Sequence, residues 1–187
     1  MTAGRKFVGG VKDWCTPPWI ISSVRDVFGG GVGLDPCSNS FSTVGADVEY
    51  CLPDRDGLVL PWDAATIFVN PPYGKDMARG TRIGHWFARA VGAAAAGSEV
   101  IMLVPVAPNT RHWKQFVWPV ASGVCFLYRS RLKFHLGGVE DPRGAPMACA
   151  VVYYGRDFWG FAEGFRCHGA VVPLTGVVLP ETTGTLF

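Results

Sequence analysis

The sequence predicts a doubly wound α/β fold, in which helices cover both faces of a mostly parallel sheet. Short apolar segments typical of strands alternate along the chain with segments whose apolar residues recur at helical spacing. The segment 100–104 is apolar throughout, which is typical of a central strand buried on both faces. The chain of 187 residues is 49% hydrophobic and only 17% charged. This composition predicts one domain over 1–187 with a sizeable core.

The first predicted element is a helix. Thr16, Pro17 and Pro18 supply an N-cap and a proline at the first helical position. Apolar residues then recur at helical spacing as far as Phe28, and glycines follow at 29–31. The helix is therefore expected to begin after Thr16 and to end before these glycines.

Two short strands are expected next, each with a polar residue at its carboxyl end. Residues 32–34 lead to Asp35, and residues 66–69 lead to Asn70. Ligands gather outside the carboxyl ends of strands in an open α/β sheet, so Asp35 and Asn70 should lie near one crevice. Only 34 residues separate them, too few for two full helix–strand units, so we expect an abbreviated sheet between these strands.

The second half of the chain continues the alternation and then changes character. The elements expected in order are a helix over 82–96, a central strand over 100–104, a short helix that Asn109 and Thr110 begin and Pro119 ends, and a strand over 124–128. Residues 131–134 and 148–154 then predict an antiparallel pair at the far edge of the sheet. Residues 1–12 and 169–187 are expected to be loosely ordered ends.

Composition also bears on partners and location. The six cysteines form no C-x-x-C pair or Cys/His cluster, so we expect buried free thiols and no metal. The longest apolar stretch, 116–128, is interrupted and too short to cross a bilayer, and the N-terminus has no secretory signal. We therefore expect a cytoplasmic protein with no membrane partner. A net charge of +2 is compatible with nucleic acid but does not require it.

The tetrapeptide Asn70-Pro71-Pro72-Tyr73 carries the candidate catalytic chemistry. An aryl amine is a poor nucleophile because its lone pair is delocalised into the ring. The Asn70 side-chain oxygen and the Pro71 carbonyl can accept N–H bonds from such an amine and stabilise the charge that develops as it attacks a methyl donor. The prolines fix the backbone and supply no N–H, and Tyr73 can stack on a base swung out of a helix. The alternative is an ordinary proline-rich turn with a surface aromatic residue.

Further motifs lie on both sides of the tetrapeptide. They are Asp13-Trp14-Cys15-Thr16-Pro17-Pro18, Leu34-Asp35-Pro36-Cys37, Asp56-Gly57-Leu58 with Trp62, and Arg131-Leu132-Lys133-Phe134. With these motifs the chain resembles the phage-type DNA N-6-adenine-methyltransferase (Dam) family from Asp13 to Tyr154. The resemblance implies a Rossmann-like S-adenosylmethionine-dependent methyltransferase fold and site-specific methylation of the adenine N6 amine in DNA. It also suggests phage-encoded protection of DNA from restriction, in the host cytoplasm.

The resemblance further implies where S-adenosylmethionine binds. Thr16 and Pro17 match the motif that holds the methionine end of the cofactor, and Asp35-Pro36-Cys37 matches the strand-end motif beside it. The full set of implied cofactor contacts is Trp14, Thr16, Pro17, Asp35, Pro36, Cys37, Asp56 and Asn70. Thr16 has an adequate second interpretation as an N-cap.

The acidic residue that holds the cofactor ribose stays open from the spacing alone. Asp47, Glu49 and Asp56 compete for this role. We favour Asp56, which looks like the acidic residue near the adenosine in the Dam family. Asp56 equally suits a turn before Gly57.

DNA contacts are expected on loops, because the chain has no room for a separate target-recognition domain. The candidates are Lys75, Arg79 and Arg82 after the tetrapeptide, Arg143 in the loop 137–146, and the alternating row of Arg129, Arg131 and Lys133. This row is equally compatible with a solvated face. Few side chains can reach base edges, so the target should be short or degenerate.

Other functions share the same tetrapeptide. It also occurs in methyltransferases that modify RNA adenine or protein glutamine, where the sheet and the cofactor would be unchanged. An alternative from another class is a catalytically silent binding module that keeps the fold. Intact Asn70 and Tyr73 argue against that alternative.

Overall fold

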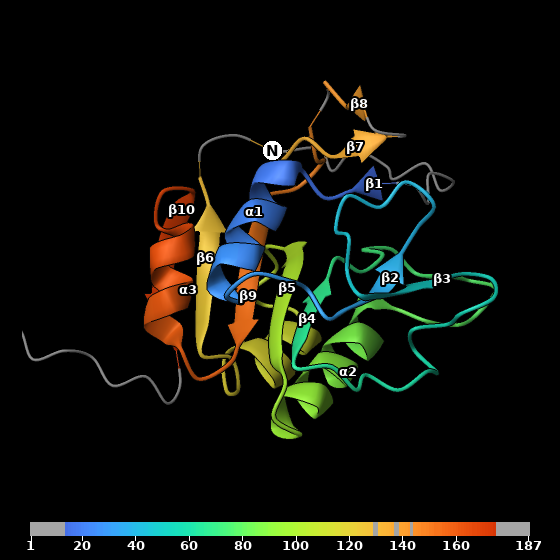
Figure 1. The fold of residues 1–187 in the computed structure, drawn as a ribbon, viewed down its shortest axis with the longest axis horizontal. Helices are drawn as coiled ribbons and strands as arrows, with labels where there is room; N and C mark the ends of the chain where they lie inside the picture. Colours follow the sequence, from blue (N-terminus) through green and yellow to red (C-terminus); the bar gives the residue numbers. More distant parts are fainter. Residues whose placement is uncertain (1–13, 129–130, 137–138, 143, 175–187) are drawn as a thin grey trace, which may run out of the picture.

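The computed structural model describes residues 14–128, 131–136, 139–142 and 144–174. Its main element is a seven-stranded sheet. The strands are β2 (Leu34–Ser38), β3 (Val48–Cys51), β4 (Thr66–Val69), β5 (Glu99–Pro105), β6 (Gly123–Leu127), β9 (Cys149–Tyr154) and β10 (Gly169–Pro173). Their order is β10-β6-β9-β5-β4-β2-β3, with parallel pairing from β3 to β5 and antiparallel pairing from β5 to β10 (Figure 1).

A small antiparallel sheet lies beyond the carboxyl ends of β4 and β5 (Figure 1). It consists of β1 (Trp14–Cys15), β7 (His135–Leu136) and β8 (Val139–Glu140), with β7 in the middle. The strands come from two distant parts of the chain. This arrangement brings the segment before the first helix next to the segment that follows β6.

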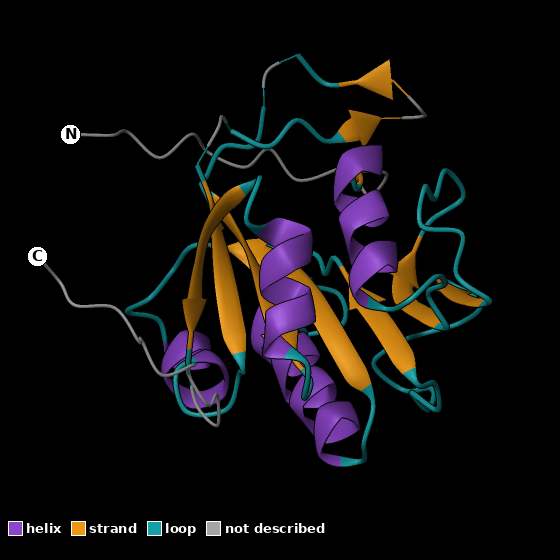
Figure 2. Cartoon of the chain, turned by 60° about the vertical axis from the view of Figure 1, so that its left-hand side comes forward, coloured by secondary structure: helices purple, strands orange, loops and turns teal. Residues whose placement is uncertain are grey.

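Helices cover both faces of the large sheet (Figure 2). They are α1 (Pro18–Val27) and α3 (Phe158–Phe165) on one face, and α2 (Ile83–Ala95) and a short π-helix η1 (Trp113–Val117) on the other. The fully buried side chains of β5 alternate between the two cores. Val100, Met102 and Val104 pack with α2 and η1, whereas Ile101 and Leu103 pack with α1 and α3. The molecule is therefore a three-layer α/β/α domain in the part described.

Most of the predicted elements are confirmed, with corrections to the first strand and the first helix. α1, β4, α2, β5 and β6 form where the sequence predicts them, and Gly97 takes a positive φ of 107° after α2. The strand expected over 32–34 lies further along the chain, as β2. The N-cap of α1 is Pro17, without a side-chain cap bond, so the prediction that Thr16 caps this helix is wrong. The Thr16 hydroxyl instead accepts a hydrogen bond from Asn70.

The predicted antiparallel pair at the far edge of the sheet is also wrong. Residues 131–134 form no strand, and β9 lies inside the sheet between β5 and β6. All six residues of β9 are buried, as expected for a strand with neighbours on both sides and helices on both faces. The strand at this edge of the sheet is β10. It forms at the start of the interval 169–187, which is expected from the sequence to be loosely ordered. Residues 1–12 and 175–187 lie outside the described residues.

The stretch between β2 and β4 is short, as expected from the spacing of Asp35 and Asn70. It is fully described, and it contains β3 but no helix. Glu49 organises the turn between β2 and β3, because its carboxylate accepts hydrogen bonds from the Ser38 and Ser42 hydroxyls and from the Ala46 amide. Loops, rather than helices, therefore border the carboxyl end of β2.

Three further observations concern the cysteines, membrane-spanning helices and metal ligands. All six cysteines are free, and Cys15, Cys125 and Cys149 are buried. Among the helices of the described ranges, none combines the length and the apolar character that crossing a membrane requires. No group of three or more potential metal ligands occurs within these ranges.

Candidate active site

Asn70 lies directly after β4, and its side-chain amide is held by a hydrogen bond. Asn70 Nδ2 donates to Thr16 Oγ1 at 3.1 Å. Thr16 is buried, and its carbonyl oxygen accepts a hydrogen bond from Thr43 Oγ1 at 2.7 Å. Because Nδ2 donates to Thr16, the amide oxygen of Asn70 is free to accept a hydrogen bond from a ligand. No described residue donates to this oxygen.

β2 lies beside β4, but Asp35 is the second residue of β2 and not, as the sequence predicts, the residue at its carboxyl end. β2 and β4 pair in parallel, and the Cys37 thiol lies against the backbone of Asn70. Burial raises the pKa of this thiol well above its ordinary value. The thiol is therefore protonated at neutral pH and behaves as a small apolar group.

Asp35 is a buried acid at this junction. Its Oδ1 accepts a hydrogen bond from the Cys37 amide at 3.0 Å. Burial raises the pKa of Asp35 to about 7, and the negative charge of Glu49 acts in the same direction. Among the residues that the structure describes, no cation forms an ion pair with Asp35. β2 thus holds, at its second residue, a carboxyl group that a positively charged ligand would stabilise in its ionised form.

The loop with the Asp56-Gly57-Leu58 motif closes over the end of β2. A Cβ atom at Gly57 would overlap the carbonyl oxygen of Pro36, so only glycine fits this close approach. Trp62 Nε1 donates to the Gly57 carbonyl at 2.7 Å, and Asp56 Oδ1 accepts from the Leu58 amide at 2.9 Å. Asp56 therefore makes the turn that its position before Gly57 suggests, and this turn lies directly beside Pro36.

The other two candidates for the ribose acid lie differently. Glu49 is engaged by the loop between β2 and β3. Asp47 is exposed at the start of β3, at the opposite end of that strand from the site. Glu49 is the register partner of Asp35 between β2 and β3, whereas Asp56 approaches the strand-end motif at Pro36 through its neighbour Gly57.

Tyr73 turns inward from the tetrapeptide. Its hydroxyl donates to the Leu103 carbonyl at 3.4 Å and lies beside the Cys149 thiol, and burial raises the pKa of the phenol well above its ordinary value. Its ring meets Phe134 edge-on with centroids 6.1 Å apart, and Phe134 stacks on Trp14 at 5.1 Å. An aromatic row therefore runs from the tetrapeptide to the small sheet.

Pro71 is buried and Pro72 exposed, so the turn is anchored on one side and open on the other. No hydrogen bond from the described residues reaches the Pro71 carbonyl. The Asn70 amide oxygen and this carbonyl are thus two acceptors without a donor in the described ranges.

The cations after the tetrapeptide fall into two groups. Lys75 and Arg82 are exposed, and the Arg82 backbone amide donates to His85 Nδ1 at 3.1 Å. Arg79 pairs with Asp56 and lies 3.9 Å from the Asp76 carboxylate. Two residues predicted separately, one for cofactor and one for DNA, thus contact each other.

The basic row before the small sheet is largely engaged within the chain. Arg131 Nη1 donates to the carbonyl oxygens of Pro146 at 2.7 Å and Ala145 at 3.4 Å, and Lys133 pairs with Glu140 at 2.9 Å. Both side chains are exposed in spite of these contacts. Arg129 and Arg143 lie outside the described residues.

Sequence reasoning missed Phe134 as a residue of this region. Leu132 and Phe134 are buried, whereas Arg131 and Lys133 are exposed. The alternation of residues 131–134 predicts a role in binding for its basic members only. The same period of two marks Phe134 as an inward-facing side chain, although no strand forms here.

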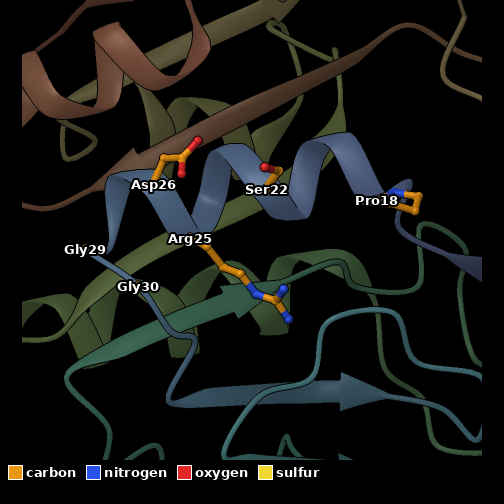
Figure 3. A pocket seen from close by; sticks show the side chains of 6 residues that line it. All are labelled: Pro18, Ser22, Arg25, Asp26, Gly29 and Gly30. Carbon is orange, nitrogen blue, oxygen red and sulfur yellow. The ribbon is translucent and has the colours of Figure 1, made fainter.

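A surface hollow of about 520 Å³ lies along α1 and is separate from this site. Its lining residues are Pro18, Ser22, Arg25, Asp26, Gly29 and Gly30 (Figure 3). The Arg25 guanidinium donates to the Val44 carbonyl at 2.7 Å, which ties α1 to the loop after β2. This contact supports the position of Thr16, at the start of the same helix.

Residues 7–169 match the protein-family model described as DNA N-6-adenine-methyltransferase (Dam), which covers most of the chain. The chain belongs to this family. Neither the curated proteins nor the solved structures contain a match to the chain.

Membership of the Dam family implies a transferase that methylates the N6 amine of adenine in DNA. The matched range of this Dam protein includes the ends of β2 and β4, the Asp56 loop and the tetrapeptide, and it ends where β10 begins. The residues that converge in the structure are therefore all inside the family match.

Proposed function

We propose that the protein transfers a methyl group from S-adenosylmethionine to the N6 amine of adenine in DNA, with Asn70-Pro71-Pro72-Tyr73 as the reaction centre. The observation that carries this proposal is the Asn70 amide at the end of β4. Thr16 holds its nitrogen at 3.1 Å, which fixes the orientation of its oxygen as an acceptor. The Dam family match supports DNA adenine as the substrate.

Asn70 and Pro71 would act on the adenine amine as acceptors. As the amine attacks a methyl group, its nitrogen becomes positively charged and its N–H groups become stronger donors. The Asn70 amide oxygen and the Pro71 carbonyl would accept these N–H groups and keep the lone pair directed at the donor. S-adenosylmethionine supplies the electrophilic methyl group when it is bound. The extra proton leaves to solvent, so the site needs no strong general base.

The residues of β2 fit this cofactor. Its methionine part carries an ammonium and its sulfur a positive charge. Asp35 is a buried carboxyl group with a pKa raised to about 7 and with no ion-pair partner in the described ranges, which suits a cationic ligand. The proposed contacts are Trp14, Thr16, Pro17, Asp35, Pro36, Cys37 and Asn70, with Asp56 considered further below.

Tyr73 would contact the base after it leaves the duplex, because an adenine amine inside a duplex cannot reach a methyl donor. The Phe134 and Tyr73 rings already meet at a steep angle, so a base would meet an aromatic surface on this side. Lys75 and Arg82 are the exposed cations closest in sequence to the tetrapeptide, and they would contact phosphates. Arg131, Lys133 and Arg143 remain candidates for the same role.

The arrangement of the sheet supports the finer assignment of a Rossmann-like methyltransferase fold. Among the parallel strands β3, β2, β4 and β5, β4 ends directly before Asn70, and Cys37 of β2 lies beside Asn70, on the side where ligands bind in open α/β sheets. The antiparallel strands β9, β6 and β10 complete the other half of the sheet. A role in protecting phage DNA from restriction, in the host cytoplasm, is proposed from the family resemblance alone.

Incubation with radiolabelled S-adenosylmethionine and separate DNA, RNA and protein substrates tests the proposal. We expect label in DNA with the parent protein and at least about 100-fold less with Asn70→Ala, by the magnitudes known for preorganised polar groups. Label in RNA or protein instead would move the assignment to the corresponding class of amine or amide methyltransferase. Absence of label from all three, with a folded protein that binds the cofactor, would favour a silent binding module.

A further inference from the structure

Two loops meet beside the candidate site, and one ion pair joins them. The first is the loop 52–65, between β3 and β4, and the second is the loop 70–82, between β4 and α2. The Asp56 carboxylate of the first loop pairs with the Arg79 guanidinium of the second. The Asp56 side chain is 27% exposed and the Arg79 side chain 24%, so the pair is half-buried and still in contact with water.

The first loop holds Asp56 in one place. Asp56 Oδ1 accepts from the Leu58 amide at 2.9 Å, and the Asp56 carbonyl accepts from the Val59 and Leu60 amides, both at 2.9 Å. The next residue, Gly57, lies against the Pro36 carbonyl so closely that no side chain fits. The position of Asp56 is therefore coupled to the strand end that we assign to the cofactor.

The second loop holds Arg79 in a closed turn. Asp76 Oδ1 accepts from the amides of Ala78 at 3.0 Å and Arg79 at 3.1 Å, and the Asp76 amide donates to the Thr81 carbonyl at 3.0 Å. Gly80 has a positive φ of 67°, a conformation that suits glycine. This turn begins three residues after Tyr73, so its position bears on the tetrapeptide and on the exposed Lys75.

Because they pair with each other, Asp56 has little capacity left to bind the cofactor ribose and Arg79 little capacity left to bind a DNA phosphate. One oxygen of Asp56 accepts from Arg79 and the other from the Leu58 amide. Arg79 is held between Asp56 and Asp76, both negatively charged, which opposes contact with a phosphate. An ion pair with this exposure adds little to the free energy of unfolding, so its effect should be local.

We propose that Asp56 and Arg79 are a positioning pair, which fastens the loop over the cofactor end of β2 to the loop that follows the tetrapeptide. Asp56 acts on the cofactor site through Gly57 and Pro36, and Arg79 acts on the base site through the turn 76–81. The effect on methyl transfer rests on the proposed function, whereas the effect on the order of the two loops does not.

Amide hydrogen exchange of the free protein tests the pair without cofactor or DNA. Asp56→Asn and Arg79→Gln should each accelerate exchange about 10-fold in both loops, at the amides of 58–60 and 76–81. The decisive observation is faster exchange in the loop that does not carry the substitution, because only a contact between the loops transmits the effect. Lys75→Gln, at an exposed position in the same loop as Arg79, is the matched control and should change neither loop.

Kinetics supply a second measurement. Each single variant should lower kcat/KM for DNA methylation about 10-fold, and the double variant Asp56→Asn with Arg79→Gln should lose no more than the worse single variant, because both lose one shared interaction. The dependence of DNA affinity on salt should be unchanged in Arg79→Gln.

Three results would overturn the inference. In the first, each substitution accelerates exchange only in its own loop. In the second, Arg79→Gln reduces the slope of log affinity against log salt by about 0.9, which identifies a phosphate contact. In the third, Asp56→Asn weakens cofactor binding without any change in exchange, which identifies a ribose contact. If the parent fails to methylate DNA, the proposed function fails, and hydrogen exchange still decides whether the pair joins the loops.

Discussion

Replacing Asp35 with asparagine should stabilise the free protein at neutral and alkaline pH. Burial raises the pKa of Asp35 from 3.8 to about 7, so the folded protein holds a proton that the unfolded chain releases above about pH 4. The free energy of unfolding of the parent should therefore fall as the pH rises from about 4 to about 7. Asparagine does not titrate, and its side-chain oxygen can still accept the hydrogen bond that the Cys37 amide donates.

The size of the effect follows from the pKa difference. A shift of about 3 units at about 1.4 kcal/mol per unit gives about 4 kcal/mol. The difference in free energy of unfolding between Asp35→Asn and the parent should thus grow by about 4 kcal/mol between pH 4 and pH 8. Below pH 4 the Asp35 contribution should be nearly absent, because the carboxyl group is then protonated in both states.

Urea denaturation of both proteins at several pH values, without cofactor, measures this difference. Asp63→Asn, at an exposed loop position, gives the reference for removal of an acidic group at the surface. A difference between Asp35→Asn and the parent that stays constant within about 1 kcal/mol from pH 4 to pH 8 would refute the reasoning, because Asp35 would then ionise in the folded protein without cost.

Three further predictions concern the tetrapeptide and the loop over β2. Asn70→Ala should lower turnover about 100-fold or more and leave cofactor affinity, measured by calorimetry, nearly unchanged. Tyr73→Ala should raise the KM for DNA much more than Tyr73→Phe, and equal losses in both variants would contradict a stacking role. Gly57→Ala should lower the free energy of unfolding by about 1–3 kcal/mol because its Cβ overlaps the Pro36 carbonyl, whereas Gly74→Ala, where a Cβ meets nothing within 4 Å, should change it little. Thermal denaturation of the two glycine variants checks this contrast.

The sequence predicts those parts of the fold that depend on local pattern. The apolar period of α2 and the unbroken apolar run of β5 identify both elements, because each pattern reflects which faces of the element are buried. The same kind of run at β9 was assigned to the sheet edge. Strand order depends on pairing between distant segments, and apolar character alone does not specify the neighbours of a strand.

α3 shows why some elements escape sequence analysis. Its buried residues Phe158, Phe161 and Phe165 have helical spacing, but Gly160 and Gly164 lie between them and lower helix propensity. Close contacts explain both glycines. A Cβ at Gly160 would overlap the carboxylate of Asp157, which caps the helix, and a Cβ at Gly164 would lie 2.7 Å from the side chain of Val27 on α1.

The sequence likewise predicts some parts of the candidate site and not others. The tetrapeptide and the strand-end motif could be identified from the sequence, because each directly follows or completes a short apolar strand. The bond between Asn70 and Thr16 joins residues 54 positions apart, and the pairing of Asp56 with Arg79 joins two loops. Such contacts depend on how loops close, which apolar periodicity does not encode.

Mass spectrometry of nucleosides from treated DNA tests the central claim most directly. Unmethylated DNA is incubated with the protein and S-adenosylmethionine carrying a deuterated methyl group, and is then digested completely. Our account expects deuterated N6-methyldeoxyadenosine with the parent protein and at least about 100-fold less of it with Asn70→Ala. Label on another nucleoside, or equal N6 labelling by the parent and Asn70→Ala, would contradict the assignment of Asn70 and its tetrapeptide as the adenine-methylating centre.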